Sequence, residues 1–363
     1  MQNPSMPRVT RLFSMALAAS VMGLAALPAH AQTTINLTAV DGYPPHSLWI
    51  KEFIEFYIPE VDKRLAKDNK FKIRWNQAWG GQIVKPTGVL EGIQKGLGDI
   101  GIVTNAIYGD KLNILAIGFA TPFVTSDPEL VTKTIDEMAE KFPAIKKTFA
   151  SYNQVYLTNS VVLDSYQVFS KTPIKSLADM KGKKLAGAGF NLRYLAPVGA
   201  VGVSGPLTGY YNQTQTGVVD GSLLWPEAAA TFKMAEVAPN MLKADIGAVN
   251  TKALTVNADV WAKLPPEVKK VMQEVAIEYR DLLAKLAKEK GASSIAAFKK
   301  AGGTVHELSK AERTQWAKSL PNMAKEWAAG LDKEGMQGTE MLNYYMNAMR
   351  VGKQPIERQW DQQ

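Results

Sequence analysis

Asp99-Ile100-Gly101-Ile102-Val103 is the stretch of sequence that most clearly indicates the fold. It is a nearly continuous apolar run, typical of a strand that is buried on both faces of a parallel sheet. The segment before it, from Thr87 to Lys95, has the spacing of a helix and ends at Gly96. A helix that leads into a fully buried strand predicts an α/β architecture.

The same alternation continues on both sides of this stretch. Two strands with alternating polar and apolar residues precede it, Thr34–Val40 and Phe71–Trp75, with a helical segment between them. A second set of strands, separated by glycine loops and short helical turns, follows at Ser165–Ser170, Lys184–Gly187 and Asp220–Leu224. The two sets predict two α/β lobes. Strands continue over residues 247–257, so more than one chain segment is expected to cross between the lobes.

A long helix is predicted after these strands. Pro265 and Pro266 open it, and apolar residues at helical spacing continue to about residue 290. A helix of about 25 residues is about 37 Å long, which exceeds the width of one small lobe. The expected organisation is a signal peptide over 1–31, lobe I over 32–160 with part of 245–363 returning to it, a lobe II core over 161–244, a lobe-spanning helix over 265–290 and C-terminal helices over 291–363.

The first 31 residues have the pattern of an export signal. Arg8 and Arg11 precede the apolar stretch Leu12–Leu27, and Ala29-His30-Ala31 matches a signal peptidase site. A retained membrane anchor is the alternative, but about 16 apolar residues are fewer than the roughly 20 that a spanning helix needs. The sequence therefore predicts an exported protein that is cleaved before Gln32.

Composition argues against several classes of protein. The chain has 363 residues, no cysteine and a formal net charge of +8, so disulfides, thiolate metal sites and a lipid-modified cysteine are excluded. His30, His46 and His306 are far apart, and GxSxG, GxxxxGK[ST] and HExxH motifs are absent. No catalytic residue, metal site or cofactor is therefore expected. Lysines are scattered among acidic residues, so nucleic acid is not an expected partner.

Two tryptophans are candidates for contact with a small ligand. Trp79 precedes Gly80-Gly81 and Trp225 precedes Pro226, each in a loop that follows a strand. Loops at strand ends are where α/β folds bind ligands, and aromatic rings there favour a ligand-facing role. The alternative is that both rings belong to the core.

Several segments resemble a known family, the DctP-type substrate-binding proteins of tripartite ATP-independent periplasmic (TRAP) transporters. The similar motifs keep the family's order over about residues 34–290. They are WGGQ at Trp79–Gln82, LEGIQKGLGDIG at Leu90–Gly101, KSLADMKGKKL at Lys175–Leu185, QTGVVDG at Gln215–Gly221, FKMAEV at Phe232–Val237 and WAKLP at Trp261–Pro265.

The resemblance implies a two-lobed periplasmic binding protein fold in which a long helix spans both lobes and the lobes close over a small organic acid. It also implies delivery of the acid to the membrane permease subunits of a TRAP transporter, driven by a sodium gradient. The protein is then expected to be a periplasmic monomer without a lipid anchor, and not an enzyme. A ligand-binding subunit of a membrane sensor and an exported enzyme on the same scaffold are the alternatives.

The chain departs from the family where the resemblance implies a carboxylate-binding arginine, because this position is Ala186. In one interpretation Arg193, near the start of a predicted helix, replaces it; a solvated surface charge is the alternative for Arg193. In the other interpretation the site is less polar and suits an aromatic or amine-bearing compound. An aromatic acid is favoured, because Ser222–Trp225 brings no acidic partner for a cation. This site would be lined by Trp79, Tyr166, Trp225 and Phe190.

Three positions complete the candidate ligand site. His46 follows Tyr43-Pro44-Pro45, in a loop that the family uses near its ligand, and Asn105 follows the Asp99–Val103 strand. Tyr166 is expected on a second-lobe strand near the hinge. For His46 the alternative is a helix cap or a surface group.

Overall fold

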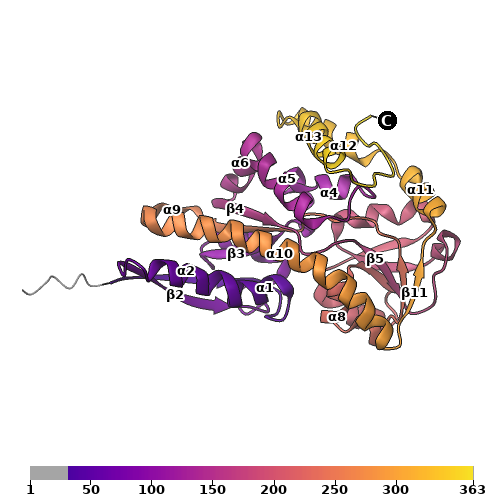
Figure 1. Ribbon diagram of the computed structural model, residues 1–363, viewed down its shortest axis with the longest axis horizontal. Coiled ribbons are helices and arrows are strands. Elements are labelled where there is room, and N and C mark those ends of the chain that lie inside the picture. The colour runs from indigo at the N-terminus through magenta and orange to yellow at the C-terminus, as the bar shows by residue number, and fades with distance from the viewer. Residues whose placement is uncertain (1–31, 363) are drawn as a thin grey trace, which may run out of the picture.

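The computed structural model describes residues 32–362, which form two lobes, each built around its own β-sheet (Figure 1). The predicted two-lobed α/β fold with a long helix is therefore confirmed. The predicted signal peptide, residues 1–31, lies outside the described residues.

Lobe I contains a five-stranded sheet. Its strands lie in the order β2 (Phe71–Ala78), β1 (Thr33–Val40), β3 (Ile100–Thr104), β10 (Lys252–Asn257) and β4 (Gln154–Ser160). Every residue of β3 is buried, as its apolar run predicts. However, β3 pairs in parallel with β1 and antiparallel with β10, so it lies in a mixed sheet and not in the parallel sheet of which its apolar run is typical. The apolar run predicts burial, but it carries no information on the direction of a partner from a much later part of the chain.

Short and medium-length helices connect these strands. They are α1 (Leu48–Glu52), α2 (Ile58–Leu65), α3 (Val89–Gln94), α4 (Ile117–Ala120), α5 (Pro128–Lys141), α6 (Ala144–Ser151) and α9 (Ala258–Lys263). At the start of α5, the Asp127 carboxylate accepts hydrogen bonds from the backbone N–H groups of Glu129 and Leu130. Pro128 takes the first helical position, where no N–H is needed. Local sequence therefore fixes where this helix begins.

Lobe II contains a six-stranded sheet. Its strands lie in the order β11 (Thr304–Glu307), β9 (Asn240–Lys243), β5 (Gln167–Ser170), β8 (Gly221–Leu224), β6 (Lys184–Gly187) and β7 (Val201–Ser204). Helices α7 (Tyr210–Gln215), α8 (Pro226–Thr231) and α11 (Lys310–Ser319) pack in this lobe, whereas α12 (Met323–Lys333) and α13 (Gly338–Val351) pack on α4 and α5 of lobe I. The segment 291–363, for which the sequence predicts helices, thus also contributes the strand β11.

The long helix α10 extends from Pro266 to Lys300 and is 35 residues long, or about 52 Å. It ends beyond the predicted end at residue 290. Its first half packs on lobe I, where the Tyr279 hydroxyl donates to the Trp49 carbonyl oxygen at 2.6 Å. Its last turns pack on lobe II, where the rings of Phe298 and Phe169 have centroids 5.5 Å apart. One helix therefore spans both lobes (Figure 1).

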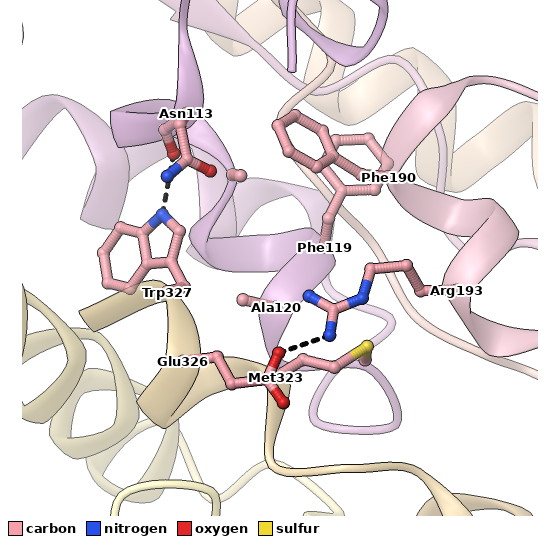
Figure 2. Close-up of a pocket in the computed structure, with 9 residues that line it drawn as sticks. Asn113, Phe119, Ala120, Phe190, Arg193, Met323, Glu326 and Trp327 are labelled. Atoms are coloured by element: carbon pink, nitrogen blue, oxygen red, sulfur yellow. Dashed lines mark hydrogen bonds and ion pairs between the residues drawn. The ribbon is translucent and has the colours of Figure 1, made fainter. Parts of the chain in front are cut away.

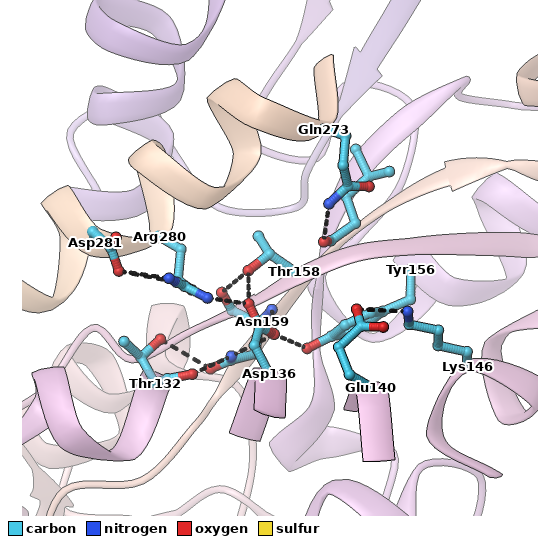
Figure 3. Close-up of polar contacts among 11 residues, drawn as sticks. Thr132, Asp136, Glu140, Lys146, Tyr156, Thr158, Asn159, Gln273, Arg280 and Asp281 are labelled. Atoms are coloured by element: carbon cyan, nitrogen blue, oxygen red, sulfur yellow. Dashed lines mark hydrogen bonds and ion pairs between the residues drawn. The ribbon is translucent and has the colours of Figure 1, made fainter. Parts of the chain in front are cut away.

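Asp136 of α5 fixes α10 to lobe I (Figure 3). Its carboxylate accepts hydrogen bonds from the hydroxyls of Tyr156 at 2.6 Å and Thr158 at 2.5 Å, and from the side-chain amide of Asn159 at 2.8 Å. The Arg280 guanidinium of α10 forms an ion pair with the same carboxylate at 2.6 Å. Both side chains of this pair are mostly buried, so α5, β4 and α10 are held at one point.

Two short segments, 161–166 and 244–251, connect the two sheets beside α10. They lie next to each other, because the Ile246 N–H donates to the Tyr166 carbonyl oxygen at 3.1 Å. Both segments therefore cross between the lobes at the same place, which is the arrangement expected of a hinge.

Gly291 marks where α10 passes this hinge. A Cβ atom at this position would lie 2.1 Å from Oδ2 of Asp164, which belongs to the first crossing segment. The helix and the crossing therefore approach each other more closely than any side chain larger than that of glycine permits.

Candidate functional site

A cavity lies between the lobes, where β1 and β3 of lobe I end. The volume that the centres of water molecules can occupy in it is about 30 Å³, which is room for about two waters. Crevices at the carboxyl ends of strands are the usual ligand sites of α/β folds. This inter-lobe cavity is lined by Tyr43, Thr104 and Lys252 of lobe I, by Asn191, Tyr210 and Trp225 of lobe II, and by Tyr166 and Thr251 at the ends of the two crossing segments, among others. Tyr166 precedes β5 and is not on the strand predicted for it.

Lys252 places an ammonium group in the wall of this cavity. The residue opens β10 and pairs in register with Thr104, the last residue of β3, so it lies at the edge of the lobe I sheet that faces lobe II. Its Nζ donates to the Thr104 hydroxyl at 2.8 Å and lies 4.0 Å from the Trp49 ring and 4.8 Å from the Tyr43 ring. The side chain is 2% exposed. Ring faces and one hydroxyl therefore hold a buried cation.

Asp41 lies next to this cation at the end of β1. Its carboxylate accepts hydrogen bonds from the Tyr43 backbone N–H at 2.8 Å and from Trp49 Nε1 at 3.1 Å. Burial raises the pKa of Asp41 to about 7, although the charge of Lys252 opposes the shift. Burial likewise lowers the pKa of Lys252 to about 7, and Asp41 opposes this change. The Trp49 ring contacts both Asp41 and Lys252, so the two groups lie in the same buried environment.

Two polar atoms in the cavity wall lack a hydrogen-bond partner. Within residues 32–362, these are Oγ1 of Thr251 and Oδ1 of Asn191, on side chains that are 2% and 1% exposed. Asn191 belongs to lobe II, and Thr251 is the last residue of the second crossing segment, next to β10 of lobe I. Buried polar atoms are almost always satisfied in folded proteins, so a pair of unsatisfied ones in one cavity indicates that a polar molecule binds there.

Tyr166 and Trp225 supply the aromatic part of the wall. Their rings meet edge to face, with centroids 6.0 Å apart. Trp225 follows the strand β8 and precedes Pro226, the first residue of α8, so its position is set by a strand-to-helix turn. Its Nε1 donates to Glu227 at 3.0 Å, which holds the indole in place. Both residues are predicted candidates, and the structure brings them together.

Arg193 and Phe190 lie at a different cavity, here called the outer cavity (Figure 2). It is more open to solvent and is bordered by α4, the helical segment Gly189–Tyr194 and α12. Arg193 forms an ion pair with Glu326 of α12, and the two side chains are 47% and 53% exposed. The Phe190 ring packs against Phe119. The structure therefore does not bring Arg193 into the inter-lobe cavity.

The remaining candidates do not line the inter-lobe cavity. Trp79 is buried in lobe I, where its Nε1 donates to Gln77 at 3.0 Å. Asn105 is buried between two wall residues, and its side-chain amide donates to the Asn250 carbonyl oxygen at 3.2 Å.

His46 is exposed on the lobe I side. Its ring meets that of Phe232, at the end of α8, with centroids 5.7 Å apart. His46 therefore contacts the other lobe, but it does so at the surface of the molecule.

Lys252 and Asp41 are the site residues that sequence reasoning misses. The available signal is that Lys252 is the one charged residue between Asp245 and Asp259. A lysine inside such an uncharged strand is rarely buried without a partner or a role.

The described chain lacks a metal-binding cluster and a membrane-spanning helix. Within residues 32–362, no three His, Cys, Asp or Glu side chains are grouped in a way that could hold a metal ion. No helix in the same range is both long enough and apolar enough to span a membrane.

A two-lobed α/β molecule with a cavity that both lobes line has the architecture of a solute-binding protein. The chain belongs to the bacterial extracellular solute-binding protein family 7, the DctP family, whose model matches residues 60–330. The resemblance to TRAP-transporter binding proteins is thereby confirmed. Proteins of this family are receptors and not enzymes, so the interpretation that the chain has no catalytic role is also confirmed.

Individual proteins show the same relationship. The C4-dicarboxylate-binding periplasmic protein DctP of Rhodobacter capsulatus is 34% identical over 125 residues, which are 34% of this chain and 37% of that protein. The match thus spans little more than a third of the relative's length.

Two solved TRAP solute-binding proteins have the same fold. The protein from Bordetella bronchiseptica with bound (R)- and (S)-mandelate has a TM-score of 0.77 at 19% identity, covering 87% of this chain and 99% of that one. The protein from Rhodoferax ferrireducens with copurified benzoate has a TM-score of 0.77 at 18% identity, covering 88% and 98%. At this level of identity the similarity shows the fold.

Proposed function

We propose that the protein is the extracytoplasmic binding subunit of a TRAP transporter, which captures a small organic acid between its lobes and delivers it to a membrane permease. The observation that carries this proposal is the inter-lobe cavity, whose walls come from both lobes. A ligand in such a cavity contacts both lobes at once and therefore favours their closed arrangement. Family membership supports the same role.

The proposed ligand is compact and has an apolar or aromatic body. Tyr166, Tyr210 and Trp225 offer ring surface, and Ala186, at the position implied for an arginine, is buried and uncharged. Two structural neighbours bind mandelate and benzoate, which are acids built on a single ring. The cavity has room for about two waters, so the lobes have to separate to admit any acid, and a compact acid requires the smallest separation.

The proposed location is the periplasm. Export through the signal peptide over residues 1–31, cleavage before Gln32 and a monomeric state without a lipid anchor belong to this proposal. The absence of cysteine from the sequence supports the last point.

Binding is tested by calorimetry on the exported form, which begins at Gln32. The protein is unfolded and refolded to remove copurified solutes, and it is then titrated with benzoate, mandelate, pyroglutamate, lactate and succinate. We expect at least one acid to bind and to reduce the radius of gyration in X-ray scattering, because closure makes the molecule more compact. Failure of every acid to bind would contradict the proposal.

Trp225→Ala tests whether the inter-lobe cavity is the site. We expect affinity for the best acid to fall about 10- to 100-fold, because the indole supplies a large part of the wall. Arg193→Ala is the matched control, since Arg193 lies at the outer cavity in an exposed ion pair that contributes little. Circular dichroism checks that both variants are folded. The opposite pattern, with loss only in Arg193→Ala, would place the site at the outer cavity.

Delivery is tested separately from binding. Vesicles that contain a TRAP permease and an inward sodium gradient should accumulate the labelled acid only when the binding protein is added outside. Uptake that is independent of the protein would leave a receptor without a transport role.

A further inference from the structure

We infer that Lys252 receives the carboxylate of the ligand, and that the site selects compact monocarboxylates with a hydrogen-bond donor on the carbon next to the carboxylate. This inference rests on the proposed function and names the ligand class of the same cavity. It also places the anion-binding group on lobe I, at the start of β10, and not on the lobe II strand that contains Ala186.

Lys252 has N–H donors that make no hydrogen bond within residues 32–362. An ammonium group has three donors, and the one hydrogen bond that Lys252 makes is to the Thr104 hydroxyl. The salt bridges found within residues 32–362 do not include Lys252. A buried cation that lines a cavity, with donors to spare and no carboxylate in contact, is suited to bind an anion from outside the chain.

Two polar atoms beside Lys252 and across the cavity from it, Thr251 Oγ1 and Asn191 Oδ1, can bind polar groups of the ligand. The Thr251 hydroxyl is adjacent to Lys252 in the chain and can donate to a second carboxylate oxygen. The Asn191 side chain, on lobe II, hydrogen-bonds to the Tyr166 hydroxyl, and its Oδ1 is an acceptor that has no donor within the described residues. A ligand that presents a carboxylate to Lys252 and a hydroxyl or N–H to Asn191 would satisfy all three groups. The 2-hydroxy acids and the cyclic amide acid pyroglutamate have this combination.

The charge of the cavity wall limits how many carboxylates a ligand can have. Among the described residues that line the inter-lobe cavity, Lys252 alone is basic. The nearby carboxylate of Asp41 is fully buried and acts on Lys252 electrostatically. A second carboxylate on the ligand would therefore be buried without a cation and beside a negative group, which is strongly unfavourable. One cation limits the ligand to one carboxylate.

Arg193 does not meet these requirements. Its guanidinium is already paired with Glu326, and both side chains are about half exposed. It lines the outer cavity with Phe190 and Trp327 (Figure 2). An exposed and neutralised cation gives a carboxylate little net stabilisation.

The test compares ligand pairs in wild-type and variant proteins by calorimetry. Mandelate is compared with mandelamide, which lacks the charge, with phenylacetate, which lacks the hydroxyl, and with succinate, which has a second carboxylate. Lactate and propionate form a smaller pair for the hydroxyl. The variant Lys252→Met removes the cation, and Asp41→Asn/Lys252→Met removes both buried charges in case the single variant is unstable. Lys72→Met is the matched control, because Lys72 is exposed and pairs with Thr34 at the far end of β1.

In the wild type we expect the hydroxy acids to bind at least about tenfold more tightly than the amide, the deoxy acid and succinate. Lys252→Met should lower the affinity for the acids about 100-fold and change the affinity for the amide little. Lys72→Met should bind all of these ligands as tightly as the wild type does. Acid binding in the folded double variant within threefold of the wild type would refute the role of Lys252 and leave the proposed function intact. Tight succinate binding would refute the monocarboxylate class, and absence of binding by every acid in the wild type would refute the proposed function itself.

Discussion

Lys252 is a positive charge that is almost out of contact with water, and this makes its proton sensitive to its neighbours. Burial lowers its pKa to about 7, and the carboxylate of Asp41 opposes this change. The other titratable groups that face it are Tyr43, Tyr166 and Tyr210, and burial raises the pKa of each. These phenols therefore stay neutral near pH 7, and Lys252 and Asp41 determine the charge of the cavity.

Affinity for a carboxylate should therefore depend on pH. The protonated fraction of Lys252 decreases as pH rises above about 7, so we expect binding to be strongest near pH 6 and to weaken by up to about tenfold per unit above pH 8. Binding above pH 7 should take up a proton, which calorimetry in buffers of different ionisation enthalpy measures. The uncharged amide of the same acid is the control and should show no such slope. An acid affinity that is constant from pH 6 to 9 would mean that Lys252 does not contact the carboxylate.

The sequence predicts part of this site and misses the rest for a definable reason. Trp225 could be identified because it precedes a proline at the end of a strand, and Tyr166 because its strand starts near the hinge. Lys252 could not be paired with Asp41 or Thr104, since these residues are distant in the chain and meet only through the pairing of β10 with β3. Arg193 has the right chemistry, but tertiary contacts with Glu326 place it at the outer cavity.

At the scale of secondary-structure elements, one mostly buried carboxylate links α10 to two other elements of lobe I. The Asp136 carboxylate accepts hydrogen bonds from side chains of β4 and forms an ion pair with Arg280 of α10 (Figure 3). The apolar stripe of α10 is evident in the sequence, and it predicts that the helix packs. It does not predict where along its length the helix is fixed, because that depends on α5 and β4.

Asp136→Asn should lower the free energy of unfolding by about 2–4 kcal/mol, because it leaves the mostly buried Arg280 with the half-exposed Asp281 as its acidic partner and weakens the bonds from Tyr156 and Thr158. Urea denaturation monitored by circular dichroism measures the change. Glu140→Gln is the control, since Glu140 is on the same helix and pairs with Lys146 at the surface (Figure 3); we expect it to cost less than about 1 kcal/mol. Equal effects of the two substitutions would show that Asp136 does not anchor the helix.

At the scale of the whole molecule, two sheets, two crossing segments and one shared helix make a hinged pair of lobes (Figure 1). The number of lobes and the lobe-spanning helix follow from local patterns that the sequence displays. The insertion of β10 between β3 and β4 does not, because strand order depends on contacts between distant segments. The ligand cavity lies next to this insertion, which is why its lobe I wall was the harder part to predict.

Gly291→Ala tests the close approach at the hinge. Alanine normally stabilises a helix by about 1 kcal/mol relative to glycine. Here the new Cβ would lie 2.1 Å from Oδ2 of Asp164, so we expect a net loss of about 1–2 kcal/mol in denaturation experiments. Gly330→Ala in α12 is the control, because its Cβ would meet no atom within 4 Å, and it should stabilise the protein. A stabilising Gly291→Ala would mean that α10 and the crossing segment separate easily.

The inter-lobe cavity has its cation on the lobe I wall and the rings of Tyr210 and Trp225 on the lobe II wall, so the two lobes act at different stages of binding. While the lobes are apart, Lys252 can attract an acid, so lobe I determines the association rate and its dependence on salt. Tyr210 and Trp225 enclose the ligand only after closure, and release requires them to move away, so lobe II determines the dissociation rate. Evolution or engineering could therefore change how fast the protein loads without changing how long it holds its cargo.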